Sequence, residues 1–111
     1  MKGSHVGEFE ELVLLAVHGL GADAYGVSVQ QLLERETTRD VSLGAVYAAL
    51  DRLDAKGFLR SAMTAGTAMR GGRSRRAFAL TPAGARALDE MRRVRDRLYG
   101  ARPIKPARLR A

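Results

Sequence analysis

Arginine is concentrated in one short stretch of the sequence, between positions 70 and 76. The stretch contains two adjacent glycines, and no Asp or Glu occurs anywhere between Asp54 and Asp89. Guanidinium groups on a glycine-rich loop create a positive field that suits a polyanion, and they contact nucleic-acid backbones or a narrow minor groove. The alternative is a solvated loop without a partner. The first chemistry that the sequence predicts is phosphate recognition by Arg70, Arg73, Arg75 and Arg76.

Residue types that carry catalysis or bind metals are scarce in the sequence. It contains no cysteine, and its two histidines, His5 and His18, stand in a predicted arm and at a predicted helix end. Asp51 and Asp54 are interpreted as surface charge on the outer end of a helix. The Gly71-Gly72 pair lacks the Lys-Ser/Thr that completes a phosphate-cradling loop. We therefore expect no enzyme, no metal site and no cofactor.

The net charge of +7 is distributed unevenly along the 111 residues. The last eleven residues carry no acid, and we expect residues 101–111 to be a flexible basic tail. Its four bases would add non-specific affinity for DNA phosphates. A lipid anchor is the alternative, although such anchors use a bulky apolar face. The bases are Arg102, Lys105, Arg108 and Arg110.

The sequence predicts a cytoplasmic protein without membrane association. Its longest apolar run, residues 12–17, is much shorter than the roughly 18 residues that a membrane span requires. The run follows three glutamates, where a secretory signal would carry positive charge. The lack of cysteine fits a reducing compartment.

Apolar periodicity and capping residues predict helices around a small hairpin in a single domain. After an N-terminal arm, residues 1–7, we expect helices from Glu8 to about Gly19, from Tyr25 to Glu36 and from Ser42 to Lys56. Strands at 58–63 and 76–80 enclose a long loop, and a last helix runs from Thr81-Pro82 to Gly100. This order is that of a winged helix-turn-helix fold, mostly α with a two-stranded β-wing. We assign residues 8–80 to the winged helix-turn-helix domain and residues 81–100 to a separate last helix.

The third predicted helix has one apolar stripe, and its other faces are small or polar. Leu43, Val46, Leu50 and Leu53 recur at spacings of three and four, and Ser42 is the expected N-cap. Small side chains let a helix lie deep in a major groove, where alanine contacts thymine methyl groups. Free N–H groups at the helix start can receive a phosphate. We therefore predict a DNA-reading helix whose more exposed residues are Ser42, Gly44, Ala45, Ala48, Ala49 and Arg52.

Two predicted helices carry more apolar surface than a small domain can cover. The first helix is apolar on every side, which requires cover on more than one face. The last helix presents an apolar stripe opposite a dense set of arginines. We expect a second copy of the chain to cover both, although part of the stripe could instead line an effector cavity. The expected dimer seam consists of Phe9, Leu12, Leu15, Leu88, Met91, Val94 and Leu98.

Three motifs in order resemble those of the PadR-like transcriptional regulators. Residues 40–59 resemble the family's recognition-helix signature, with Ser, a small residue, Tyr, Leu, Leu and Gly at matching intervals. Ala24-Tyr25-Gly26-Val27 resembles the Tyr-Gly opening of the second helix. Residues 71–84 resemble the wing and its Leu-Thr-Pro-x-Gly exit. The resemblance covers residues 8–98, nearly all of the predicted domain.

The resemblance implies a homodimer that binds a pseudo-palindromic operator, usually as a repressor released by a small ligand or another signal. It implies dimerisation through the last helix against the partner's first helix, and DNA contacts from Tyr25, Ser42, Tyr47 and the wing arginines. Structural packing is the alternative role for each tyrosine. Ala48 stands where many relatives have proline, which leaves the helix start regular. The lack of tryptophan argues against a flat aromatic drug as the effector, whose identity stays open.

Two hypotheses of different classes follow from these observations. The first is a sequence-specific regulator that binds double-stranded DNA. The second is a non-catalytic winged-helix module whose basic face docks an acidic protein or structured RNA. Dependence of binding on DNA sequence separates them, because phosphate contacts position a protein whereas base contacts specify.

Overall fold

The computed structural model describes residues 5–64 and 74–109. Its elements, in order, are α1 (Glu8–Leu20), the 3-10 turn η1 (Gly21–Asp23), α2 (Gly26–Thr37), α3 (Leu43–Ala55), β1 (Leu59–Met63), β2 (Arg76–Leu80) and α4 (Pro82–Tyr99). The predicted winged-helix fold is confirmed, and the predicted bounds agree within one or two residues. The tip of the predicted wing, including Arg70 and Arg73, lies outside the described residues.

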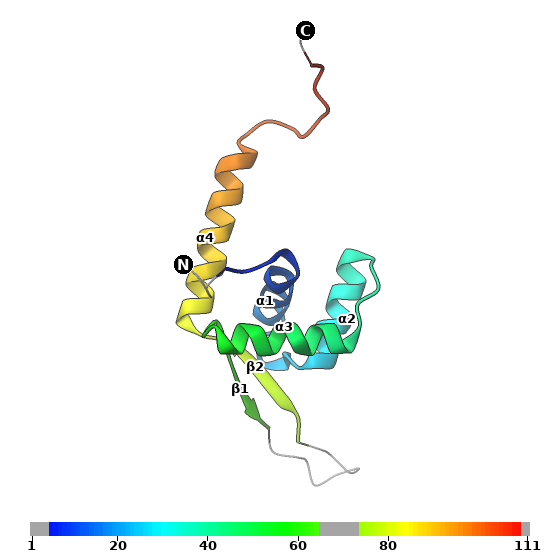
Figure 1. Cartoon of the computed structure of the whole chain (residues 1–111), viewed down its shortest axis with the longest axis vertical. Helices are drawn as coiled ribbons and strands as arrows, with labels where there is room; N and C mark the ends of the chain where they lie inside the picture. The colour runs from blue at the N-terminus through cyan, green and yellow to red at the C-terminus, as the bar shows by residue number, and fades with distance from the viewer. Residues whose placement is uncertain (1–4, 65–73, 110–111) are drawn as a thin grey trace.

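The elements form a three-helix bundle from which two parts project. Figure 1 shows the hairpin and α4 leaving the bundle in opposite directions, with the chain beyond α4 continuing away from the hairpin. The strands pair antiparallel, from Leu59 opposite Leu80 to Met63 opposite Arg76. The hairpin is fastened to the start of α2, because the Phe78 amide donates to the Ala24 carbonyl at 2.9 Å and Tyr25 bridges to Ala77.

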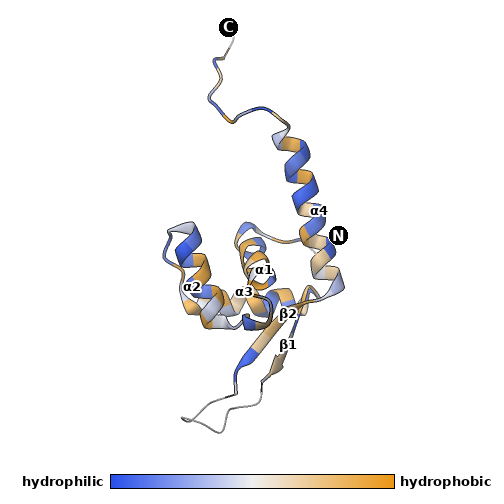
Figure 2. Cartoon of the chain, turned by 180° about the vertical axis from the view of Figure 1, so that it is seen from behind, coloured by the Kyte–Doolittle hydropathy of each residue, from blue (hydrophilic) through white to orange (hydrophobic). Residues whose placement is uncertain are grey.

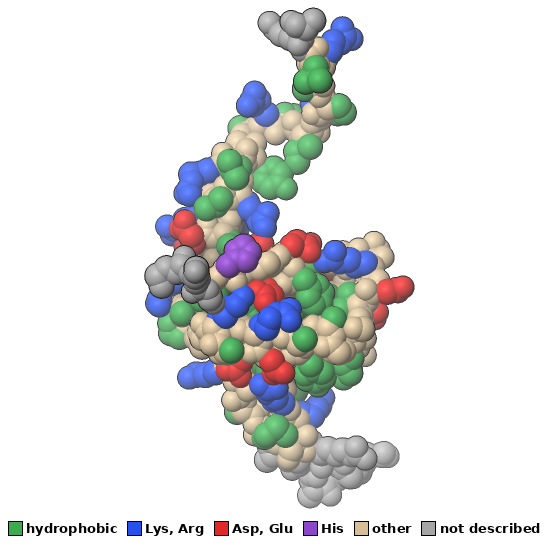
Figure 3. All heavy atoms as spheres, viewed as in Figure 1, with side chains coloured by type: hydrophobic (Ala, Val, Ile, Leu, Met, Phe, Trp, Pro, Cys, Tyr) green, Lys and Arg blue, Asp and Glu red, His purple; other side chains and the backbone are tan. Residues whose placement is uncertain are grey.

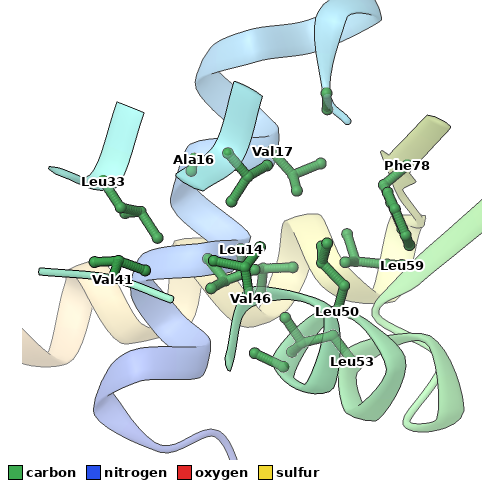
Figure 4. Packing of buried hydrophobic residues seen from close by; sticks show 14 residues of the cluster. Leu14, Ala16, Val17, Leu33, Val41, Val46, Leu50, Leu53, Leu59 and Phe78 are labelled. Carbon is green, nitrogen blue, oxygen red and sulfur yellow. The ribbon is translucent and has the colours of Figure 1, made fainter. Parts of the chain in front are cut away.

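The core lies where α1, α2 and α3 meet the base of the hairpin (Figure 4). Leu14 of α1, Leu50 of α3 and Phe78 of β2 are at most 2% exposed. One expectation about which residues face the core was wrong. Ala49, assigned to the more exposed faces of the third helix, is completely buried.

The junction between the hairpin and α4 is tightly built around Thr81 and Gly84. The Thr81 hydroxyl accepts the Gly84 amide at 3.0 Å and donates to the Gly57 carbonyl at 2.6 Å. The Thr81 amide donates to the Phe58 carbonyl at 3.1 Å. A Cβ placed on Gly84 would lie 2.1 Å from that same Phe58 oxygen. The Leu-Thr-Pro-x-Gly sequence is therefore a capping motif in which glycine lets α4 approach the chain just before β1.

Candidate nucleic-acid interface

The exposed face of α3 is formed by small residues near its start. The Ser42 hydroxyl caps the helix by accepting the Ala45 amide at 3.0 Å, as predicted. Gly44, Ala45 and Ala48 are all exposed, while Val46, Leu50 and Leu53 hold the opposite face in the core. A ridge of small side chains at a helix start can lie close to base edges in a major groove.

Tyr47 of α3 lies against the first turn of α2. A Cβ added to Gly26 would fall 2.3 Å from Cζ of the Tyr47 ring, so the Tyr-Gly opening of α2 leaves room for this ring. Tyr47 is 37% exposed. Its ring therefore packs between the two helices while part of it stays open to solvent, and its contact with DNA stays a prediction.

Arg75, the residue immediately before β2, stacks on Tyr25. Its guanidinium carbon lies 4.3 Å from the centroid of the Tyr25 ring, a cation–π distance. The Thr64 amide donates to the Arg75 carbonyl at 2.7 Å, which ties the two sides of the hairpin together at this point. Tyr25 is the N-cap residue of α2. The structure thus gathers Tyr25, Gly26, Tyr47 and Arg75 at the start of α2.

Arg76 is engaged by acidic residues of α3. It bonds Asp51 at 2.7 Å and Asp54 at 3.3 Å. It also donates to the Ser61 hydroxyl at 3.1 Å, and its guanidinium carbon lies 4.8 Å from the Phe78 ring centroid. Asp51 and Asp54 carry surface charge, as interpreted, with side chains 59% and 36% exposed, and in addition both hold Arg76 of the hairpin against α3. DNA contact by Arg76 stays a prediction. Its guanidinium already binds the carboxylates of Asp51 and Asp54.

Arg52, also predicted to contact DNA, bonds a buried carboxylate of α1. Glu10, whose side chain is 9% exposed, accepts from Arg52 Nε at 2.6 Å and from Lys56 Nζ at 2.8 Å. It also accepts the Gly7 amide at 3.2 Å, and Lys56 donates to the His5 carbonyl. Burial by itself raises the pKa of Glu10, but the hydrogen bonds from Lys56, Arg52 and the Gly7 amide outweigh it and lower the pKa from 4.5 to about 2.

This lowered pKa predicts acid sensitivity. A group with a lowered folded-state pKa contributes stability above its unfolded-state pKa and loses it as the pH falls through the folded-state value. We expect the free energy of unfolding lost in Glu10→Gln, relative to the wild type, to be constant above about pH 5 and to shrink between the ordinary pKa of 4.5 and about 2. Urea denaturation across a pH series measures it. Glu8→Gln, at a side chain 68% exposed, is the control, and a difference independent of pH would contradict the assignment.

The predicted seam residues divide into two groups. Phe9, Leu12, Leu88 and Met91 are partly buried against the core of their own chain. Leu15, Val94 and Leu98 are 44%, 37% and 82% exposed, and Tyr99 beside them is 59% exposed, a residue that the sequence did not single out. Figure 2 shows apolar bands continuing along α4 beyond the bundle. Its outer half therefore presents apolar side chains that the single chain does not cover.

Acidic and basic side chains are interspersed over the bundle (Figure 3), whereas the charged side chains among the described residues after α4 are all basic. Figure 3 shows acidic and basic side chains next to one another across α3. Basic side chains continue along α4 and the chain beyond it, where Arg102, Lys105 and Arg108 are exposed. None of the helices that the structure describes is long and apolar enough to cross a membrane.

A three-helix bundle with a paired hairpin against its reading helix defines the winged-helix class of DNA-binding domains. The model of the transcriptional regulator PadR-like family matches residues 14–90, and the chain belongs to this family of DNA-binding regulators. No curated protein sequence matches the chain.

Solved structures agree with this assignment. The chain is similar to a PadR-like transcription factor from Bacteroides fragilis, with 26% identity over 82% of each chain and a TM-score of 0.69. It is also similar to a PadR family transcription regulator from Clostridium difficile R20291, with 25% identity over 84% of this chain and 91% of that one and a TM-score of 0.64. The H. salinarum RosR structure shares the fold at 23% identity, with a TM-score of 0.68 over 88% of this chain and 81% of that one.

Proposed function

We propose that this protein is a homodimeric repressor that binds a pseudo-palindromic operator in double-stranded DNA. The observation that carries the proposal is the exposed ridge of Gly44, Ala45 and Ala48 on α3, beside the stacked pair of Tyr25 and Arg75. The ridge would contact base edges in the major groove, and the Tyr25–Arg75 pair would bind the DNA phosphate backbone beside that groove. We further propose that the protein works in the cytoplasm and catalyses no reaction.

The start of α2 is the proposed binding site for the DNA phosphate backbone, called the anchor below. N–H groups of a first helical turn carry partial positive charge and favour phosphate. The Arg75 guanidinium above Tyr25 adds a full charge at the same place, and the partly exposed Tyr47 ring borders it. A DNA phosphate at this anchor would fix the register of α3 in the groove.

The outer half of α4 is the proposed dimer seam, together with Leu15 of α1. Leu15, Leu80 and Leu88 line a groove of about 280 Å³ between the two helices, bordered by His18 and Arg92. The exposed side chains of Val94 and Leu98 on a partner's α4 have the apolar character that this groove requires. A twofold dimer presents two reading helices to two inverted half-sites.

Selection from a random duplex library tests this function. It uses the purified full chain at about 150 mM salt, where non-specific phosphate binding is partly screened. We expect an inverted repeat whose half-site spacing reports the geometry of the dimer. Recovery of no motif by folded protein that still binds duplex weakly would favour a winged-helix module for an acidic protein or RNA.

Substitutions at the anchor and on the ridge should have different effects. Arg75→Ala is expected to weaken binding to every duplex by about tenfold and to reduce the salt slope by about 1, because it removes a phosphate contact. Ala45→Ser or Ala48→Ser should instead change the order of preference among operators. Fluorescence anisotropy on several duplexes at several salt concentrations measures both.

Arg35→Ala is the matched control for these measurements. Arg35 is an exposed basic residue in the last turn of α2, where it pairs with Glu36. We expect its removal to leave both affinity and preference unchanged. A loss for Arg75→Ala that is confined to one sequence would contradict a backbone role for Arg75.

A further inference from the structure

Two adjacent carboxylates near the start of α1 are buried and bind different helices. Taken as whole residues, Glu10 and Glu11 are 7% and 9% exposed. Glu10 accepts from Arg52 and Lys56, both at the C-terminal end of α3. Glu11 accepts two bonds from Arg95 of α4, one of them from Nε at 3.0 Å. One turn of α1 is therefore bonded to the reading helix and to the projecting helix.

The contact with α4 lies where that helix leaves the bundle. Met91 is the last hydrophobic side chain of α4 that packs against the core, and Arg95 stands one turn further out. Arg95 is flanked on the same helix by Val94 and precedes Leu98, the exposed residues of the proposed seam. A partner subunit that binds this half of α4 would therefore act directly on the helix that Glu11 holds.

The contact with α3 is equally direct. Two cationic groups converge on the two oxygens of Glu10, and charge-assisted bonds of this kind have strict geometry. Burial also protects the carboxylate from screening by salt. Successive residues of a helix are about 100° apart around its axis, so Glu10 and Glu11 point to different neighbours, and any rotation of α1 moves both contacts together.

We propose that Glu10 and Glu11 are positioning residues that couple the dimer seam to the reading helix through α1. Arg52 and Arg95 are their partners, and Arg52 acts on DNA by holding α3 rather than by contacting bases. The proposal rests on the proposed dimer. The coupling would make the orientation of α3 depend on whether a partner subunit binds the outer half of α4. Coupling of this kind requires a rigid element whose position depends on both the seam and α3, and α1 is that element.

A spectroscopic measurement separates coupling from simple stabilisation. The chain contains no cysteine, so two spin labels can be placed by Gly19→Cys on α1 and Ala48→Cys on α3. Both positions are exposed, and a Cβ added to Gly19 meets no atom within 4 Å. Labelled full-length chain is diluted with unlabelled chain, and the distance distribution is recorded in three backgrounds. These are wild type, Arg95→Gln and, as the matched control, Arg93→Gln, whose exposed pair with Asp89 at 2.9 Å lies on the same helix.

Arg95→Gln is expected to broaden or shift the α1–α3 distance although neither label lies on α4, and Arg93→Gln should leave it unchanged. In the label-free protein, Arg95→Gln and Glu10→Gln should each weaken binding to the selected operator about five- to tenfold, at concentrations where sedimentation shows a dimer. Glu11→Arg combined with Arg95→Glu should restore much of that affinity. An unchanged distance in Arg95→Gln, or a loss of affinity no larger than that of Arg93→Gln, would overturn the proposal.

The two readouts also separate this proposal from the function on which it rests. The distance measurement uses no DNA. If library selection recovers no motif, the proposed operator binding fails, while a shifted α1–α3 distance in Arg95→Gln still supports the coupling.

Discussion

Gly84→Ala is expected to destabilise the folded protein by about 3 kcal/mol, because it forces a methyl group into a backbone carbonyl. The new Cβ would lie 2.1 Å from the Phe58 oxygen and 3.0 Å from its carbonyl carbon. Backbone atoms cannot turn away as a side chain can, and the same oxygen accepts the Thr81 amide at 3.1 Å. Relief of the clash therefore separates α4 from the hairpin. Urea denaturation measures the loss, and the Tm should fall by roughly 15 °C.

Gly19→Ala is the matched control for this substitution. Gly19 lies near the end of α1, and an added Cβ there meets no atom within 4 Å. Alanine should therefore stabilise the protein slightly, by up to about 1 kcal/mol, through its better helix propensity. Gly84→Ala with the stability of the wild type would mean that α4 does not approach Phe58 as closely as the structure shows.

Local signals in the sequence were enough to predict the elements and their order. Ser42 accepts the predicted capping bond, and the last helix begins after Thr81 and ends at Gly100 as expected. The need for glycine at position 84 could not be derived in the same way. It depends on a carbonyl 26 positions earlier, which only the folded chain brings to the start of α4.

The exposed residues of α3 were predicted correctly except for Ala49, which is buried. Ala49 follows Val46 by three positions and precedes Leu53 by four, so it belongs to the buried stripe. Its small side chain gave no hydrophobic signal of its own, and it was assigned to the exposed faces. A strict 3.6-residue period, applied without regard to size, would have placed it correctly.

The ion pairs were not predictable because their partners are distant in sequence. Glu10 and Glu11 stand in the first turn of α1, where the helix dipole favours acidic side chains whatever their tertiary contacts. Their burial depends on Arg52, which is 42 positions from Glu10, and on Arg95, which is 84 positions from Glu11. No local sequence pattern predicts which basic side chain will pair with which acidic side chain across such separations.

The arginines of the wing show how neighbours in sequence separate in space. Arg75 and Arg76 were grouped as one phosphate-binding cluster. Adjacent residues of an extended chain point to opposite faces. Arg76 accordingly bonds Asp51 and Asp54 of α3, while Arg75 stacks on Tyr25 at the start of α2. Of these two, Arg75 is the better placed to receive a phosphate.

Leu98→Glu is expected to convert the proposed dimer into a monomer and to weaken binding to the proposed operator at least a hundredfold. Leu98 is 82% exposed in the single chain, so its loss should leave the fold of the monomer intact. In the proposed seam, however, a carboxylate would be buried among apolar side chains, which is costly without a partner. Two linked half-sites bind with an avidity of about 10²–10⁴ over one, and a monomer forfeits it. Analytical ultracentrifugation and operator titration measure the two effects.

Ile104→Glu makes the same chemical change at a residue that is 80% exposed but lies beyond α4. It should leave both the dimer and the operator affinity intact, which separates the effect of the seam from that of added negative charge. Leu98→Met should also remain dimeric, because it keeps an apolar side chain of similar volume. A Leu98→Glu protein that stays dimeric and keeps its affinity would place the subunit contact elsewhere. The apolar stripe on the outer half of α4 would then have no part in bringing two reading helices to one operator.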